Sequence, residues 1–366
     1  MGSSFRNVGA LLLAFLEVAL AQTLPPVPAD PLELVTGAAQ TVQDAQQRAE
    51  AIALLNNARA LSNVRAQPYD LKTSFSSSGG LASDGNWMLE DIARGRHYRW
   101  TAQGPNYSAV NLYPESVQGV LYGNQSSAAT PLRLMQVRNA IFFVYPMIGP
   151  YASVRTATGL LNGTPQHCVL VVFGAGDRTF TGARNWQESE HCVDAQTGLL
   201  TTYSAAPGMY VHYDYSSGIR FHDKMIPTGF TITQAGQAVV EAKTMSVTDP
   251  PDAKDPVFSP AGLAELGVGR ATNPPMNFRS RIGAGGRWFS PAVNPTSLQV
   301  VVLHGNVAAD GHLSEVEILA SSDASLNQDV LRHAKEWRQM RGPGQPGATL
   351  QSQEMILTYE YATSGR

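Results

Sequence analysis

The segment from Tyr69 to Val247 alternates apolar and polar residues in short runs, and this period of two constrains the fold more than any other feature of the chain. About ten runs follow one another with Gly, Asn, Asp or Pro between them: YDLKTSF, GNWMLEDIA, RHYRWTA, YSAVNLY, GVLYG, IFFVYP, CVLVVF, GLLTTYS, MYVHYDY and AVVEAKTMSV. Side chains of a strand point alternately to its two faces, so each run predicts a half-buried strand. Their regular succession without intervening helices predicts an antiparallel curved sheet or barrel.

Large apolar side chains of these runs are candidates for a concave face that binds an apolar ligand such as an acyl chain. The candidates are Trp87, Tyr98, Trp100, Phe142, Val144, Leu170, Val172 and Tyr203. The alternative is that these side chains form an ordinary core and bind nothing.

A helix is expected before the strands, over roughly residues 42–61. Apolar residues recur there at spacings of three and four, which makes one apolar stripe along a helix: Val42, Ala45, Ala49, Ile52, Leu55 and Ala58. This pattern predicts a helix that packs on the body of the sheet.

The N-terminus has the pattern of an export signal. Arg6 precedes the apolar stretch VGALLLAFLEVALA, which ends in the small-x-small sequence Ala19-Leu20-Ala21. We expect residues 1–21 to be a cleaved signal peptide and the mature protein to begin at Gln22, in the periplasm or outside the cell. The alternative is an uncleaved membrane tether, although Glu17 within the stretch is unusual for either.

Only two cysteines, Cys168 and Cys192, are present. An even number of cysteines in an oxidising compartment predicts a disulfide, here between the strand-like runs HCVLVVF and RNWQESEHCVD. The bridge would close a loop of about 25 residues and stabilise the fold by roughly 3 kcal/mol. A zinc site with His167 and His191 is the alternative, but adjacent residues of a strand point to opposite faces and cannot converge on one ion.

Residues 251–295 interrupt the strand pattern with many prolines and glycines, which predicts an extended linker. It would join a β domain at residues 22–250 to a small domain at residues 296–366. The expected fold class is therefore α+β, with an antiparallel half-barrel followed by a β-β-α-β unit.

Two runs of the C-terminal unit, SLQVVVLHGNV and LSEVEILAS, flank Asp310-Gly311 and predict a β-hairpin. Ser325 and Gln328 form a capping-box pattern that predicts a helix from Leu326. EMILTYEY supplies a third strand. The core expected for this unit consists of Val316, Ile318, Leu326, Val330, Ala334, Trp337, Leu357 and Tyr359.

This unit resembles the C-terminal domain of TonB-type energy transducers. Residues that match the pattern of this family are Ser321, Ser322, Leu326, Ala334 and Trp337, whereas RQMRGPGQPG after Trp337 departs from it. The resemblance implies a protein partner that adds a strand to the edge of the sheet, either at Glu354–Tyr361 or at the first hairpin.

The preceding region is similar to the LolA/LolB-like periplasmic lipoprotein carriers. The similarity lies in a helix followed by many antiparallel strands, and in the runs CVDAQTGLLTTYS and HYDYSSGIRFHDKMIPTGFTI. It implies an apolar cavity for acyl chains under a curved sheet.

Catalytic motifs are not found: the sequence contains no G-x-S-x-G, H-E-x-x-H, Walker or EF-hand pattern. Charged residues make up 15% and the net charge is −3, so nothing indicates nucleic acid as a partner. We therefore expect a non-enzymatic envelope protein without metal or cofactor. The alternative is a hydrolase or metal-dependent enzyme that uses His212, Asp214 and His222.

Overall fold

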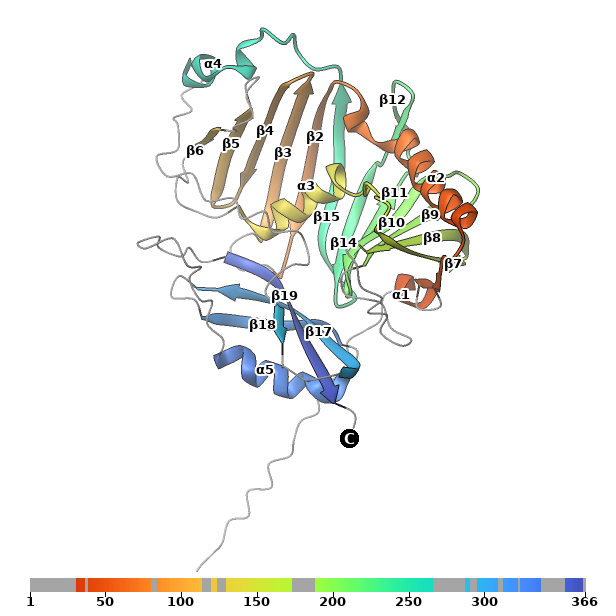
Figure 1. The fold of residues 1–366 in the computed structure, drawn as a ribbon. Coiled ribbons are helices and arrows are strands. Elements are labelled where there is room, and N and C mark those ends of the chain that lie inside the picture. The colour runs from red at the N-terminus through yellow and green to blue at the C-terminus, as the bar shows by residue number, and fades with distance from the viewer. Residues whose placement is uncertain are drawn as a thin grey trace, which may run out of the picture.

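The computed structural model describes residues 31–36, 39–79, 84–113, 120–123, 130–172, 188–265, 287–289, 295–308, 312–321, 323–336 and 353–364. The large antiparallel sheet has thirteen strands in the order β1-β7-β8-β9-β10-β11-β14-β15-β2-β3-β4-β5-β6 and curves around the helices α2 and α3 (Figure 1). The expected α+β class, with a curved antiparallel sheet and a small C-terminal sheet, is confirmed.

The strands of this sheet join neighbours in the chain through short turns over most of its width. Their bounds are β1 Gln40–Thr41, β2 Tyr69–Ser77, β3 Gly85–Arg94, β4 His97–Gly104, β5 Tyr107–Tyr113, β6 Val120–Gly123, β7 Ser153–Leu161, β8 Thr164–Val172, β9 Ser189–Asp194, β10 Leu200–Ala206, β11 Met209–Asp214, β14 Gly229–Gln234 and β15 Gln237–Thr248. The strands β12 (Ile219–Phe221) and β13 (Lys224–Ile226) form a separate hairpin.

Strand β2 shows why the period of two produces this fold. Tyr69, Leu71 and Phe75 are buried on one side, whereas Lys72 between them is exposed. One face of the sheet therefore contributes to the core and the other reaches solvent, as expected for an antiparallel sheet.

Helix α2 (Ala45–Ser62) begins after Asp44, whose carboxylate accepts hydrogen bonds from the backbone of Gln46 and Gln47. It buries Ala51, Leu55 and Ala58 against the concave face of β7–β10. Of the stripe expected from the sequence, Leu55 and Ala58 are buried and Val42 packs against the same cluster, whereas Ala45 and Ala49 are exposed.

Helix α3 (Leu132–Phe142) corrects the sequence analysis, which predicts a strand in IFFVYP. Ile141 and Phe142 instead form its last turn. Most of its residues are buried and none is exposed, so the polar face that usually reveals an amphipathic helix is missing from the sequence. In Figure 1 this helix crosses the concave side of the large sheet.

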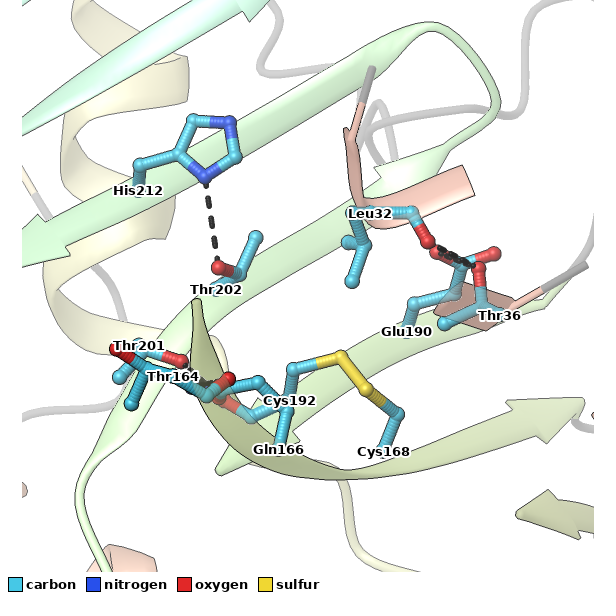
Figure 2. Close-up of a disulfide and its surroundings, with 10 residues drawn as sticks. All are labelled: Leu32, Thr36, Thr164, Gln166, Cys168, Glu190, Cys192, Thr201, Thr202 and His212. Carbon is cyan, nitrogen blue, oxygen red and sulfur yellow. Dashed lines mark hydrogen bonds between the residues drawn. A yellow bond between two sulfur atoms is a disulfide. The ribbon is translucent and has the colours of Figure 1, made fainter. Parts of the chain in front are cut away.

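The short helix α1 (Pro31–Thr36) covers the opposite, convex face near the disulfide. Cys168 and Cys192 are directly opposed on β8 and β9 and form the expected disulfide (Figure 2). His191 lies on the concave face, where its ring is 5.2 Å from that of Tyr203. The two cysteines thus point away from this histidine, as the alternation of a strand requires.

The small sheet has the strand order β16-β19-β17-β18. Its elements are β16 Arg287–Phe289, β17 Pro295–Val307, β18 Leu313–Ser321, the 3₁₀ turn Ala324–Leu326, α5 Asn327–Glu336 and β19 Gln353–Ser364. The strand β16 pairs with β19 in parallel and was not expected. The turn at Asp310-Gly311 lies outside the described residues, but β17 and β18 pair antiparallel on either side of it.

The core of the small unit lies between its sheet and α5. Among the residues expected there, Val330, Ala334 and Leu357 are buried in one cluster, and Val316, Ile318 and Leu326 pack against it. Trp337 and the side chain of Tyr359 lie outside the described residues, as does Ser322. The cap differs from the expectation, because the capping residue is Asp323 and not Ser325. The carboxylate of Asp323 accepts hydrogen bonds from the backbone N–H and from the hydroxyl of Ser325.

Within the expected linker, two short segments pack on the large sheet. A 3₁₀ turn at Pro256–Phe258 places the ring of Phe258 5.6 Å from that of His97, and α4 (Pro260–Glu265) buries Leu263 against Leu112. None of the helices in the described ranges is long and apolar enough to cross a membrane. The expected signal peptide at residues 1–21 lies outside these ranges.

Candidate functional site

The concave face of the large sheet forms a continuous apolar layer under α3. The rings of Phe75 and Trp87 stack with 5.6 Å between their centroids, and Tyr107 lies 5.8 Å beyond Trp87. The indole of Trp87 lies directly over Gly104 of β4, where a Cβ atom would be 2.5 Å from the ring. Only glycine permits so close an approach, which holds the indole flat on the neighbouring strand.

An internal cavity of about 40 Å³ lies between this face, α2 and α3. Most of its wall is apolar, and three tyrosines with a few hydroxyls complete it. The lining residues are Ser62, Val64, Leu71, Thr73, Ala140, Ile141, Val144, Tyr145, Leu200, Tyr213, Tyr215, Ile226, Pro227, Phe230 and Thr244.

The tyrosine hydroxyls of the cavity bind protein groups and carry no charge. Tyr213 donates to the carbonyl of Ala140 at 2.6 Å, Tyr215 donates to the carbonyl of Leu200 at 3.1 Å, and the hydroxyl oxygen of Tyr145 lies 2.6 Å from that of Ser62. Burial raises the pKa of Tyr145 to about 12 and that of Tyr213 well above the ordinary value. The wall is therefore neutral at physiological pH and suits an uncharged, apolar guest.

A buried charge cluster fastens α3 to the sheet next to this layer. Asp91 is completely buried and accepts hydrogen bonds from Tyr69 at 2.8 Å and Tyr98 at 2.7 Å. Arg138 of α3 lies 3.6 Å from the Asp91 carboxylate and 4.4 Å above the ring of Trp100. Burial raises the pKa of Asp91, and Arg138 is the strongest influence that opposes this rise.

The eight candidate ligand-binding residues do not form one pocket. Trp87, Tyr98 and Trp100 lie on the concave face in or against one apolar cluster, and Val144 alone among the eight lines the cavity. The ring of Phe142 stacks on Tyr69, with 5.8 Å between centroids. Tyr203 packs against two concave clusters.

Leu170 and Val172 correct the expectation that all eight line the concave face. Leu170 packs with Leu32 of α1 and with the two cysteines on the convex face, and Val172 follows it two positions later on the same strand. Their neighbours Val169 and Val171 point to the concave side. A continuous apolar run such as CVLVVF, buried on both faces, does not reveal which alternate set faces inward.

Sequence reasoning missed Asp91, Arg133 and Arg138, the charged groups of this region. Asp91 is a single acidic residue at an inward position of GNWMLEDIA, and this break in the alternation is the signal that could have found it. Arg133 and Arg138 were missed because α3 was not predicted. Without a helix that packs on the sheet, the sequence gives no reason to expect buried arginines here.

The residues of the alternative catalytic hypothesis each have a local partner. His212 Nδ1 lies 3.4 Å from the Thr202 hydroxyl (Figure 2), and Asp214 accepts hydrogen bonds from Ser216 in the following turn. His222 contacts Asp249 at 2.9 Å. Across the described ranges, no three His, Cys, Asp or Glu side chains are grouped so that they could hold a metal ion.

A larger, open depression of about 580 Å³ borders the same strands. Its walls include Ser74, Glu241 and Lys243, which alternate with inward residues and so lie on the outer face. Because it is open to solvent and charged side chains stand in its wall, it is a weaker candidate for an apolar ligand than the concave side.

No protein-family model matches the chain, and no curated protein matches it. Similar solved structures include the crystal structure of a LolA superfamily protein from Nitrosomonas europaea, with 11% identity, 58% of this chain and 98% of that chain covered, and a TM-score of 0.38. The TonB-like resemblance of the small unit thus has no support from a family model. The chemical properties of the site are therefore inferred from its own residues.

Proposed function

We propose that this chain is an exported, non-enzymatic binding protein that takes up an apolar ligand of the acyl-chain class beneath α3. The observation that carries the proposal is the neutral, largely apolar wall shared by the concave face, α2 and α3. The cavity of about 40 Å³ is far smaller than the 300–1,000 Å³ typical of ligand pockets. Uptake therefore requires α3 to move away from the sheet.

A fluorescent long-chain fatty acid and the purified, delipidated full-length protein test this proposal. Thr73 lines the cavity and Ser76 is exposed on the same strand, so Thr73→Phe fills the cavity while Ser76→Phe is a matched control. We expect saturable binding that Thr73→Phe weakens at least tenfold and Ser76→Phe leaves unchanged. Absence of binding to the wild-type protein, or equal binding by both variants, contradicts the proposal.

The small C-terminal sheet is proposed to bind a protein partner through β18. Of the two edges expected from the sequence, Glu354–Tyr361 belongs to β19, which lies between β17 and β16, whereas β18 is an edge strand. An edge strand offers unpaired backbone groups to another chain. We place this partner-binding unit at residues 296–366, after a β domain at 22–250 and a linker at 251–295.

Photo-crosslinking in living cells tests this partner site. Glu315 is exposed on β18 and Leu160 is exposed on β7, so a benzoylphenylalanine at each position compares the proposed edge with a distant surface. We expect a specific adduct from position 315 only. Adducts from both positions, or from neither, count against β18 as the partner edge.

Export is tested by mass spectrometry of the mature protein. A processed signal predicts Gln22 as the first residue and a mass two hydrogens below that of the reduced chain, because Cys168 and Cys192 are bridged. An intact Met1 would instead support the tether.

A further inference from the structure

The small C-terminal sheet closes one end of the half-barrel with the face that α5 leaves uncovered. Val302, Leu319 and Ile356 of this face belong to the same buried cluster as Leu134 and Val137 of α3. The cluster also contains the concave residues of β2–β5. Figure 1 shows the small sheet against the end of the large one, with α5 on its far side.

The two sheets approach each other closely at Gly208, in the turn between β10 and β11. A Cβ atom at this position would lie 2.2 Å from the carbonyl oxygen of Leu319 in β18. Such close contact between two backbones indicates a well-packed interface, because surfaces that are not complementary leave gaps between their side chains.

Buried polar groups lie on both sides of the same interface. Arg133, in the first turn of α3, is completely buried. Its Nη1 donates to Gln136 at 3.0 Å, while Nε and Nη2 have no hydrogen-bond partner among the described residues. Burial lowers the pKa of Arg133, and the carboxylate of Glu354 in β19 is the largest influence against this. His304 of β17 lies 3.3 Å from Glu354.

Helix α3 thus has two attachments. Leu134 and Val137 share a buried cluster with the small sheet, whereas Arg138 and the carbonyl of Ala140 bind Asp91 and Tyr213 of the large sheet. The helix cannot leave the concave face as a rigid rod without also exposing the cluster that it shares with the small sheet. Exposing buried apolar side chains to water is costly, so both contacts open together or α3 stays closed.

We propose that α3 couples ligand uptake in the half-barrel to the docking of the C-terminal sheet, so that a bound apolar ligand loosens this sheet and frees it for its partner. The coupling rests on the proposed function, because it assigns a regulatory role to the same cavity. Thermodynamic linkage makes it reciprocal: a change that undocks the sheet must make α3 easier to open and the cavity easier to fill.

Amide hydrogen exchange of the full-length protein tests the coupling without any ligand. Gly208→Ala pushes a methyl group against Leu319, while Gly163→Ala places the same methyl group in open space. The two glycines have similar positive φ angles, 73° and 82°, so the backbone strain is matched. We expect Gly208→Ala to speed exchange in α3 and in β17–β19 several-fold, and Gly163→Ala to leave both at the wild-type rate.

Faster exchange in the small sheet with unchanged exchange in α3 would overturn the coupling, as would equal effects of both variants. If Gly208→Ala does not fold, Ile356→Ala, which removes a side chain of the small sheet from the cluster shared with α3, gives the same comparison. In a second arm, Gly208→Ala should bind the fluorescent fatty acid more tightly than Gly163→Ala. A fatty acid that binds none of the proteins contradicts the proposed function alone, since the exchange result stands without it.

Discussion

At the scale of single residues, Asp91 and Arg138 are the groups on which the position of α3 depends most. Asp91 is an acid in an apolar layer, where its two tyrosine donors and Arg138 replace the water that it loses on folding. A buried ion pair adds little net stability when intact but penalises the loss of one partner heavily. The pair therefore fixes where α3 lies more than it strengthens the fold.

Arg138→Met should destabilise the protein by about 3 kcal/mol, the lower end of the range for a broken buried pair, because Asp91 keeps both tyrosine bonds. Lys72→Met is the control: Lys72 also contacts a carboxylate, that of Glu90 at 3.1 Å, but its side chain is 46% exposed. We expect the control to change stability by less than about 1 kcal/mol. Urea unfolding curves of both variants measure the difference, and equal losses would mean that the cluster does not hold α3.

At the scale of elements, the C-terminal helix gives a test that depends on pH. Hydrogen bonds from the side chain and backbone of Ser325 lower the pKa of Asp323. A depressed carboxyl pKa means that the cap stabilises the folded state above the unfolded pKa, near 3.9, and that this contribution is lost as the pH falls through the folded value.

Asp323→Ala should cost about 1 kcal/mol at pH 7 and less at pH 2, because the cap carboxylate takes up protons as the pH falls. Asp323→Asn keeps a capping oxygen without a titrating group, so it should stay close to the wild type at pH 7. Denaturant midpoints of the three proteins at both pH values measure this. A loss of the same size at pH 2 would place the effect of Asp323 elsewhere than in its carboxylate.

The disulfide between β8 and β9 gives a second test at this scale. It closes a segment with a sequence separation of 24, so its removal should cost about 3 kcal/mol through the entropy of the unfolded chain. Since the chain has two cysteines, the Cys168→Ala/Cys192→Ala variant should show this loss and should not respond to a reductant. A wild type whose unfolding is unchanged by dithiothreitol would contradict the expectation.

Elements with a clear period could be predicted from the sequence, and those without one could not. The alternation in YDLKTSF predicts β2 and its inward side, because only one face is buried. CVLVVF is buried on both faces, so the strand is predictable but the inward set, Val169 and Val171, is not. Helix α3 escapes prediction for a similar reason, since most of its residues are buried and none is exposed. The site depends on α3, and therefore most of it was beyond sequence reasoning.

At the scale of the whole molecule, the sequence predicts two domains on a flexible linker, whereas the structure shows both sheets contributing to one buried cluster. The two arrangements predict different exposure for the face of the small sheet that α5 leaves uncovered. A sheet that moves freely leaves Ile356 in solvent, and a docked sheet buries it: its side chain is 6% exposed.

Ile356→Ala in the full-length protein distinguishes the two arrangements. In a docked sheet it should cost about 2–4 kcal/mol, because the large-to-small change leaves a cavity between the sheets. On a free sheet it would act as a surface substitution, within about 0.5 kcal/mol. Leu160→Ala is the control for a removed apolar side chain, since Leu160 is 65% exposed. If urea unfolding gives equal, small effects for both variants, the small sheet is not docked on the half-barrel, and coupling through α3 loses its physical basis.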